Sequence, residues 1–292
     1  MTSLKLEPVY FNTELSEKTF NYLKNQKYIE YKKIKIFIEN KFCADHPYGF
    51  LIVDSNSNIY GFLGTMFSNR TNKDFKKYIF CNLHTWIVDK KYRINFFTNA
   101  KKILQPIFDY NCVFFAKPVG SLIRMFERNF SMTNIEMNLR LAFLPKLNFL
   151  FNQDNYEITT NQKEIEKRLS PEDLQIYLDH KKFSCYKFLI KEKNTQEQAF
   201  VVAQKTRKKF YFSFLELIYV SDSILLKNSY SEISIKLAKT FKVLFLGQNF
   251  LEDSQCSIPK NRIFFHDFKQ QIVVKNMPKL FRFNSLYTEF VH

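Results

Sequence analysis

The chain alternates between stretches in which apolar residues follow a strand pattern and stretches in which they follow a helical one. The longest strand pattern covers Tyr78–Val88, which is rich in aromatic and β-branched residues. A charged connection, Asp89 to Lys91, ends it. Apolar residues then recur at helical spacing, which predicts a helix that begins near Asn95. These residues are Phe96, Phe97, Ala100, Ile103 and Leu104.

Shorter patterns lie on both sides of this strand and helix. Two apolar runs, 50–53 and 59–67, enclose the turn residues 55–58 and predict a hairpin. Pro106 is expected to end or kink the central helix. Beyond it the pattern predicts a strand at 112–116, a helix at 121–128 and a strand at 136–144. Residues 1–45 read as helical, with a helix start at Thr13 or Ser16 and a segment 34–42 that fits helix or strand.

The same order of elements recurs in the second half of the chain. After a capped helix that starts at Ser170, the pattern predicts strands at 185–191, 198–203 and 210–220, a helix at 229–241, and strands at 243–247 and 284–291. The second set follows the first at an offset of roughly 130 residues, which indicates an internal duplication. We therefore expect two domains, 1–150 and 151–292.

Composition adds a basic character to this picture. The chain has 292 residues, 44 Lys and Arg against 28 Asp and Glu, and a net charge of +16. The abundance of Lys, Asn, Ile and Phe is read first as the codon bias of an AT-rich genome. A charge of this size still raises the local concentration of a polyanion, whether nucleic acid, an anionic membrane or a phosphorylated cofactor.

The cysteines and the apolar runs predict the compartment. The five cysteines are widely spaced and form no CxxC pair, which favours reduced, buried thiols in a cytoplasmic protein. The N-terminus has no apolar signal region, and we expect no transmembrane segment because no apolar run is long enough.

Arg93 and Asn95 stand where the central strand passes into the helix. The first amides of a helix are unpaired and its dipole attracts negative charge. This junction therefore predicts a site for a phosphorylated cofactor. The alternative is that Arg93 is a surface arginine that closes a strand–helix turn.

The segment WIVDKKYR, Trp86 to Arg93, resembles the end of the central strand in the GNAT acyltransferases (Gcn5-related N-acetyltransferases), where V-D-x-x-Y-R precedes the pyrophosphate loop. Tyr48–Gly64 resembles that family's strand–turn–strand, and Pro118–Phe130 resembles its later helix, so the likeness covers about residues 45 to 145. It implies a mixed α+β (α/β) fold with two tandem GNAT-like domains, each a mostly antiparallel mixed sheet flanked by helices.

The resemblance also implies a donor and a site. Acetyl-CoA or another acyl-CoA would be the acyl donor. The implied CoA-binding residues are Ile87, Val88, Arg93, Asn95, Phe96, Phe97 and Thr98. The implied catalytic residues are His84, Trp86 and Val88. His84 would act as a general base, and a backbone amide such as that of Val88 would stabilise an oxyanion.

These roles have structural alternatives. In an unbroken strand Asn82, His84, Trp86 and Val88 share one face. His84 could instead be a core histidine bonded to a backbone carbonyl, and the strand could be fully paired on both edges.

The sequence departs from the family pattern at three places. The turn after Arg93 has no glycine, and Met125, with Phe126 beside it, stands where many relatives have a tyrosine general acid. In the second half, Val220 is followed by Ser-Asp-Ser without a phosphate-loop candidate. We therefore expect domain 1–150 to bind acyl-CoA and domain 151–292 to be a degenerate copy.

Other candidate chemistry is weaker. His180 and Cys185 lie close together in sequence, but no supporting nucleophile motif surrounds them, so a structural role is favoured. Lysine clusters are scattered along the chain, and no metal-ligand motif or P-loop is present.

We expect a protein that transfers an acyl group from CoA to an amine or hydroxyl of a small-molecule or sugar acceptor. Two alternatives remain open: a decayed GNAT-like binding or scaffold protein, and a basic protein that binds nucleic acid or a membrane surface. The sequence does not define the oligomeric state.

Overall fold

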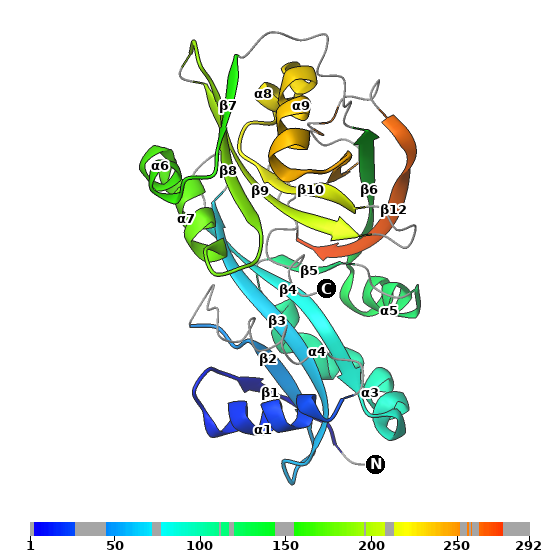
Figure 1. Cartoon of the computed structure of the whole chain (residues 1–292). Coiled ribbons are helices and arrows are strands. Elements are labelled where there is room, and N and C mark those ends of the chain that lie inside the picture. The colour runs from blue at the N-terminus through cyan, green and yellow to red at the C-terminus, as the bar shows by residue number, and fades with distance from the viewer. Residues whose placement is uncertain are drawn as a thin grey trace. The chain divides into compact units, whose positions relative to one another are not determined.

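The computed structural model describes residues 3–26, 45–71, 77–110, 112–116, 120–143, 155–195, 197–207, 213–251, 256, 258 and 263–276 (Figure 1). The chain divides into two compact units. Unit 1 contains residues 1–135 and a segment that begins at Gln271, whereas residues 136–270 belong to unit 2. The boundary expected at residue 150 falls outside the described residues.

Unit 1 is built on a mixed, mostly antiparallel sheet. Its strand order is β1-β2-β3-β4-β5-β12, with the last residues of β12 at the edge. Every neighbouring pair for which the register is described is antiparallel except β4 and β5, which run parallel. The strands are β1 (Lys5–Val9), β2 (Gly49–Val53), β3 (Ile59–Thr71), β4 (Lys77–Val88), β5 (Cys112–Ala116) and β12 (Ile263–Lys275).

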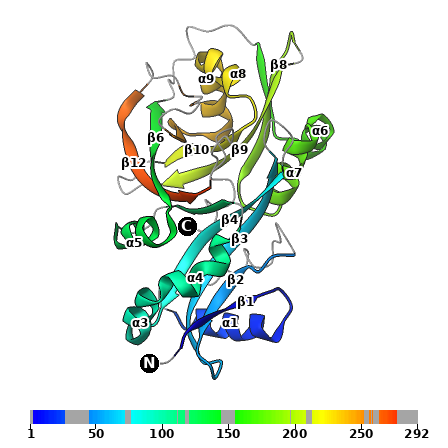
Figure 2. The same cartoon turned by 180° about the vertical axis from the view of Figure 1, so that it is seen from behind.

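Helices cover both faces of this sheet. One face packs against η1 (Lys90–Tyr92), α3 (Arg93–Thr98), α4 (Ala100–Phe108) and α5 (Gly120–Phe130), whose apolar residues share a core with β3 and β4 (Figure 2). The other face packs against α1 (Glu14–Lys24), which begins at Thr13 because the Thr13 hydroxyl accepts the Ser16 amide. Helix α4 continues through Pro106 to Phe108, so Pro106 does not end it.

Unit 2 repeats the plan. Its order is β6-β11-β10-β9-β8-β7, and among the described pairs only β10 and β11 are parallel. The strands are β6 (Thr133–Phe143), β7 (Tyr156–Thr159), β8 (Tyr186–Glu192), β9 (Gln198–Arg207), β10 (Ser213–Val220) and β11 (Phe245–Leu251). The helices are α6 (Gln162–Arg168), α7 (Pro171–His180), α8 (Ser223–Asn228) and α9 (Tyr230–Phe241). Apolar residues of α8 and α9 pack on one face, and Tyr177 of α7 meets Phe200 on β9.

The two units share a common sequence of elements. In each, an antiparallel run leads to a fourth strand, then helices, then a fifth strand parallel to the fourth. Both fourth strands also contain a register shift near their ends, at Thr85 and at Ile218. The predicted fold class, two mixed and mostly antiparallel sheets flanked by helices, is confirmed.

Most predicted elements are present within two or three residues of their expected ends. Strand β1 lies in a stretch expected to be helical. The elements β7, α6, α8 and β12 were not predicted. The expected elements at 34–42 and 284–291 lie outside the described residues. The cysteines of the described part, Cys81, Cys112, Cys185 and Cys256, are free and buried, as expected. In that part no helix has the length and apolar character needed to cross a membrane.

Candidate functional site

A β-bulge in β4 decides how the candidate residues point. Leu63 pairs with Trp86 and Gly64 pairs with His84, so Thr85 is an extra residue on β4. Thr85 has a φ of 39°, in the left-handed region that a β-branched residue rarely adopts. Such strain is often found at functional sites.

The bulge separates residues that were expected to share a face. The side chains of residues directly opposite each other on neighbouring strands point to the same face of the sheet. His84 therefore points to the face of Gly64, whereas Trp86 points to the opposite face, together with Leu63. The prediction that Asn82, His84, Trp86 and Val88 share one face is therefore wrong. A period of two holds only along an unbroken strand.

Trp86 and Val88 face helices α3 to α5. The Trp86 ring centroid lies 5.7 Å from that of Phe96 and 5.5 Å from that of Phe126. Phe96 is fully buried in this core, whereas the side chain of Phe97 remains exposed at the surface. Phe96 therefore belongs to the core and does not fill the strand–helix turn.

His84 and Asn82 face the opposite side of the sheet. The His84 ring lies directly over Gly64, since a Cβ built on Gly64 would be 2.2 Å from His84 Cε1. Its Nδ1 is 3.1 Å from the Thr85 hydroxyl oxygen, which ties the imidazole to the bulge. The ring is 5% exposed.

Asn82 was not among the functional residues predicted from the sequence. Its side chain is 1% exposed, and neither its amide nitrogen nor its oxygen has a hydrogen-bond partner among the described residues. A buried polar group without a partner costs on the order of 1–3 kcal/mol. Such a carboxamide, on the same face as His84, is suited to bind a polar ligand group. No sequence signal identifies it, because an unpaired amide is a property of packing.

Beyond the bulge, β4 has no pairing with the described residues of β5, Cys112–Ala116. Their parallel register ends at Leu83 and Phe115. The Asp89 amide bonds to the Tyr60 carbonyl on β3, so the amides and carbonyls of Val88 and Trp86 point away from β3. The backbone groups of Ile87 instead face Phe62 on β3. Two amides of β4 are thus directed to the side where its ladder with β5 has ended.

Arg93 sits at this edge. Its Nε donates to the Val88 carbonyl at 2.9 Å, which leaves the four guanidinium N–H groups on its terminal nitrogens for other acceptors. The helical turn begins earlier than predicted, at Lys90, and the Tyr92 amide bonds to the Asp89 carbonyl. The turn therefore opens with the amides of Lys90 and Lys91.

The other predicted CoA-binding residues lie within helix α3. The helix uses the amides of Phe97 and Thr98 in its own hydrogen bonds, and the Asn95 carbonyl accepts from Asn99. Lys90, Lys91 and Arg93 are all exposed. The structure thus offers three cationic side chains and the amides of Lys90 and Lys91 at the end of the open edge.

Asp89 leaves those amides uncapped. Its carboxylate makes no cap bond and instead accepts from the Tyr22 hydroxyl at 2.8 Å. Burial of the hydroxyl and this bond raise the pKa of Tyr22. In unit 2 the equivalent turn differs, because Asp222 caps the amides of Ile224 and Leu225 at 2.9 and 3.0 Å. The Asp222 carboxylate therefore occupies the helix start of unit 2, whereas the turn of unit 1 has no side-chain cap.

An aromatic pair supports the turn of unit 1. The rings of Tyr60 and Tyr92 are 3.9 Å apart, and the Tyr60 hydroxyl donates to Asp54 at 2.8 Å. Hydrogen bonds, above all from the Asn58 side chain, lower the pKa of Asp54 to about 2.

The remaining candidates have structural roles. Met125, at the position where many GNAT relatives have a tyrosine, packs partly buried against the core, and Phe126 beside it is fully buried, so neither offers a hydroxyl. The sulfur of Cys185 is directed to the His180 carbonyl and not to its ring, whose Nδ1 lies 2.7 Å from the Ile176 carbonyl. Burial raises the pKa of the Cys185 thiol. Among the described residues, no group of His, Cys, Asp or Glu could hold a metal ion.

The sequence matches no protein-family model and no curated protein. Its fold is similar to solved structures. A GCN5-related N-acetyltransferase from Kribbella flavida matches with a TM-score of 0.58 at 8% identity, over 94% of this chain and 71% of that one. The N-myristoyltransferase of Saccharomyces cerevisiae, solved with bound myristoyl-CoA, matches with a TM-score of 0.52 at 10% identity, over 98% and 88%.

A tandem GNAT protein from the clavulanic acid biosynthesis pathway matches 95% of this chain and 100% of its own, with a TM-score of 0.51 and 10% identity. The fold of this chain is therefore GNAT-like, as the resemblance implied. At such identities the likeness shows the fold alone, and any function has to be argued from the residues.

Proposed function

We propose that this protein is an acyltransferase that moves an acyl group, in the simplest case acetyl, from CoA to an amine or hydroxyl of a small-molecule or sugar acceptor. The observation that carries the proposal is the edge of β4 beyond Leu83, which has no partner among the described residues of β5 and ends at an uncapped, cationic helical turn. The free, buried cysteines are in keeping with a cytoplasmic location.

The residues present fit the charge of the CoA phosphates. Lys90, Lys91 and Arg93 would bind its phosphates, together with the first amides of the turn. The amides of Trp86 and Val88 would pair with its pantetheine arm as an added strand does. Phe96 and Phe97 leave the turn open, because one is buried in the core and the other lies at the surface.

His84 is the proposed general base. An acyl-CoA supplies the acyl group as an activated thioester. His84 would accept a proton from the acceptor amine or hydroxyl on its face of the sheet, held by the Thr85 hydroxyl and by packing on Gly64. The Val88 amide would donate to the acyl oxygen at the strand edge. Asn82 would bind a polar group of the acceptor.

The test combines binding with turnover. We expect acetyl-CoA to bind with micromolar affinity in calorimetry, and Arg93→Ala and Lys90→Ala to weaken it while Lys167→Ala, an exposed lysine on α6, does not. Myristoyl-CoA serves as the long-chain comparison. If no CoA thioester binds or raises the melting temperature at millimolar concentration, the proposal is wrong.

A binding protein without turnover is the second candidate. The lack of glycine after Arg93 and the presence of Met125 at the family's acid position favour it. His84→Ala separates the two: an enzyme keeps CoA affinity and loses turnover, whereas a scaffold has no turnover to lose.

A further inference from the structure

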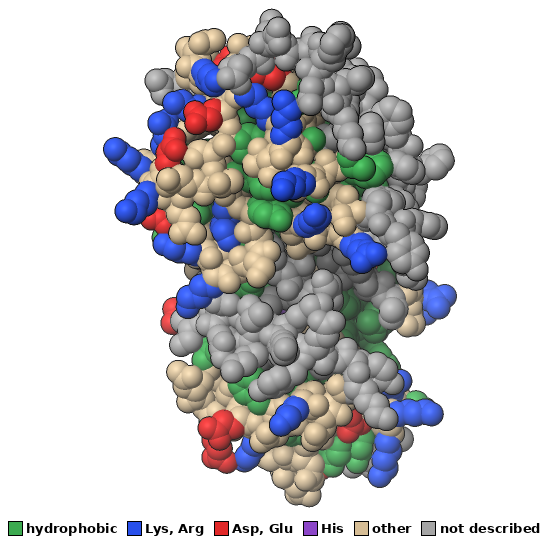
Figure 3. Space-filling model, viewed as in Figure 1, with side chains coloured by type: hydrophobic (Ala, Val, Ile, Leu, Met, Phe, Trp, Pro, Cys, Tyr) green, Lys and Arg blue, Asp and Glu red, His purple; other side chains and the backbone are tan. Residues whose placement is uncertain are grey.

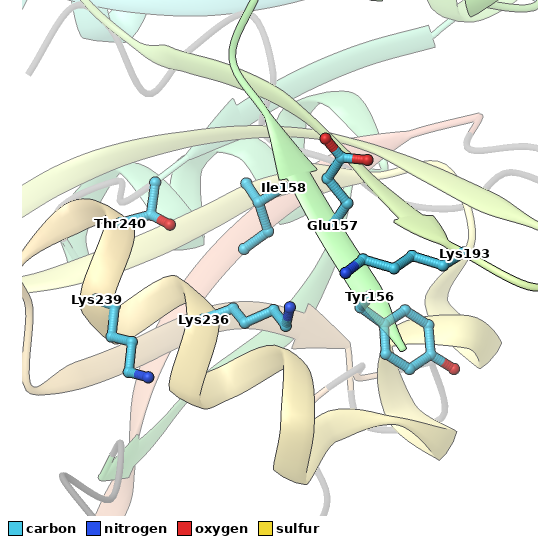
Figure 4. Close-up of a pocket in the computed structure, with 7 residues that line it drawn as sticks. All are labelled: Tyr156, Glu157, Ile158, Lys193, Lys236, Lys239 and Thr240. Atoms are coloured by element: carbon cyan, nitrogen blue, oxygen red, sulfur yellow. The ribbon is translucent and has the colours of Figure 1, made fainter. Parts of the chain in front are cut away.

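Unit 2 contains an open cavity of about 490 Å³ between strand β7 and helix α9 (Figure 4). Its walls come from three elements that are far apart in sequence: β7, the β8–β9 turn and α9. The lining residues are Tyr156, Glu157, Ile158, Lys193, Lys236, Lys239 and Thr240. The volume lies within the range of cavities that hold small ligands, roughly 300–1,000 Å³.

Three lysines line this cavity. Figure 4 shows Lys236 reaching from α9 toward β7, and Lys193 reaching toward β7 from the β8–β9 turn. Lys239 lies about one turn further along α9. Lys and Arg side chains are also spread over the face of unit 2 seen in Figure 3. The cavity is therefore a place where positive charge from separate elements converges.

Two described carboxylates lie near these lysines: Glu157 of the cavity lining and Glu232 of α9. Glu157 leaves β7 on the side opposite to Ile158, because successive side chains of a strand alternate (Figure 4). Glu232 is occupied as an acceptor: its oxygens receive the Asn155 and Tyr156 amides at 2.6 and 3.2 Å. These bonds also fix α9 against β7, so the cavity walls are held in place.

The strand itself adds a backbone donor. Among the described strands, β7 stands at the end of the strand order and pairs with β8 alone. The Lys193 amide bonds to the Asn155 carbonyl, so Asn155 faces β8 and the amides of Tyr156 and Ile158 face outward. The Glu232 carboxylate accepts the Tyr156 amide. The Ile158 amide and the Thr240 hydroxyl join the ammonium groups as donors.

From this geometry we propose that the cavity between β7 and α9 binds a small phosphorylated ligand, with Lys193, Lys236 and Lys239 as phosphate contacts. Ammonium groups, a hydroxyl and an outward amide are the donors that phosphate oxygens accept. Tyr156 and Ile158 supply an apolar wall for the remainder of the ligand. This site is independent of the proposed acyl-CoA site, which lies wholly in unit 1.

The test measures binding of pyrophosphate, ADP and glucose 6-phosphate to the full chain by calorimetry at low salt. We expect the double variant Lys236→Ala/Lys239→Ala to bind about tenfold more weakly or worse. The matched control, Lys163→Ala/Lys167→Ala on α6, removes the same charge from two exposed lysines and should leave affinity unchanged. An equal loss in both variants would mean a general charge effect and would overturn the proposal.

A site-resolved measurement distinguishes binding in this cavity from binding at the phosphate site proposed in unit 1. Lysine labelling followed by mass spectrometry should show that pyrophosphate slows modification of Lys193, Lys236 and Lys239 but not of Lys163 or Lys167. This protection should persist in Arg93→Ala. Tighter binding of ADP than of pyrophosphate would assign the apolar wall to a nucleoside, and tighter binding of glucose 6-phosphate would assign it to a sugar. Absence of protection with all three probes would refute the site.

Discussion

The position of His84 over Gly64 allows a quantitative test of the site. In Gly64→Ala the new Cβ would lie 2.2 Å from Cε1 and 2.5 Å from Nδ1 of His84, far inside contact distance, so the ring must move. Overpacking of this kind costs roughly 1–3 kcal/mol. The ring would also lose its alignment with the Thr85 hydroxyl, so we expect turnover to fall with stability.

A double-mutant cycle isolates the contact. Unfolding in urea can be followed by the fluorescence of Trp86, the protein's single tryptophan. Gly64→Ala should cost about 1–3 kcal/mol in the native background and much less in His84→Ala, because the clashing ring is absent. Gly120→Ala is the control, since its Cβ would meet no atom within 4 Å. Equal costs of Gly64→Ala in both backgrounds would show that the ring does not lie over Gly64.

Three further outcomes follow from the hydrogen bonds and burial described. The lowered pKa of Asp54, about 2, stabilises the fold fully above the ordinary value near 3.8 and less as pH falls toward 2, so Asp54→Asn should lose stability at pH 6 and match the native protein near pH 2 in denaturation curves. Tyr22→Phe should lower the free energy of unfolding by about 1 kcal/mol. It should also weaken CoA binding, because the Asp89 carboxylate is then free to cap the turn. Unchanged CoA affinity would contradict this role for Tyr22. Cys185, buried and with a raised pKa, should resist iodoacetamide until the protein unfolds, and rapid labelling in the native state would argue against the structural role.

The elements that could be predicted from sequence are those whose signals are local. The hairpin of β2 and β3 encloses its own turn residues, and α7 begins at a Ser-Pro cap in which the Ser170 hydroxyl accepts the Asp173 amide. Strand β1 gave no such signal. Its five residues gain their order by pairing with β2, more than 35 residues away in the chain.

The candidate site could be predicted only in part, for a physical reason. The strand, the cationic turn and Arg93 are visible in the sequence because charge and apolar period are local properties. The bulge at Thr85 is not, because the extra residue is defined by the register with β3. A side-chain period of two along the whole strand therefore predicted, wrongly, that Trp86 and His84 share a face. The roles of Asn82 and Tyr22 likewise depend on which groups tertiary packing brings near them.

The discontinuous make-up of unit 1 has a consequence for how the protein is made. Strand β5 lies next to Ile272–Lys275, which the ribosome adds only after all of residues 136–270. At about 5–20 residues per second, unit 1 waits several seconds for its closing strand, while unit 2 by then has all of its polypeptide except Arg282–Leu286. A nascent chain arrested before Gln271 should therefore expose the outer edge of β5, and the unit begun first should be the last to mature.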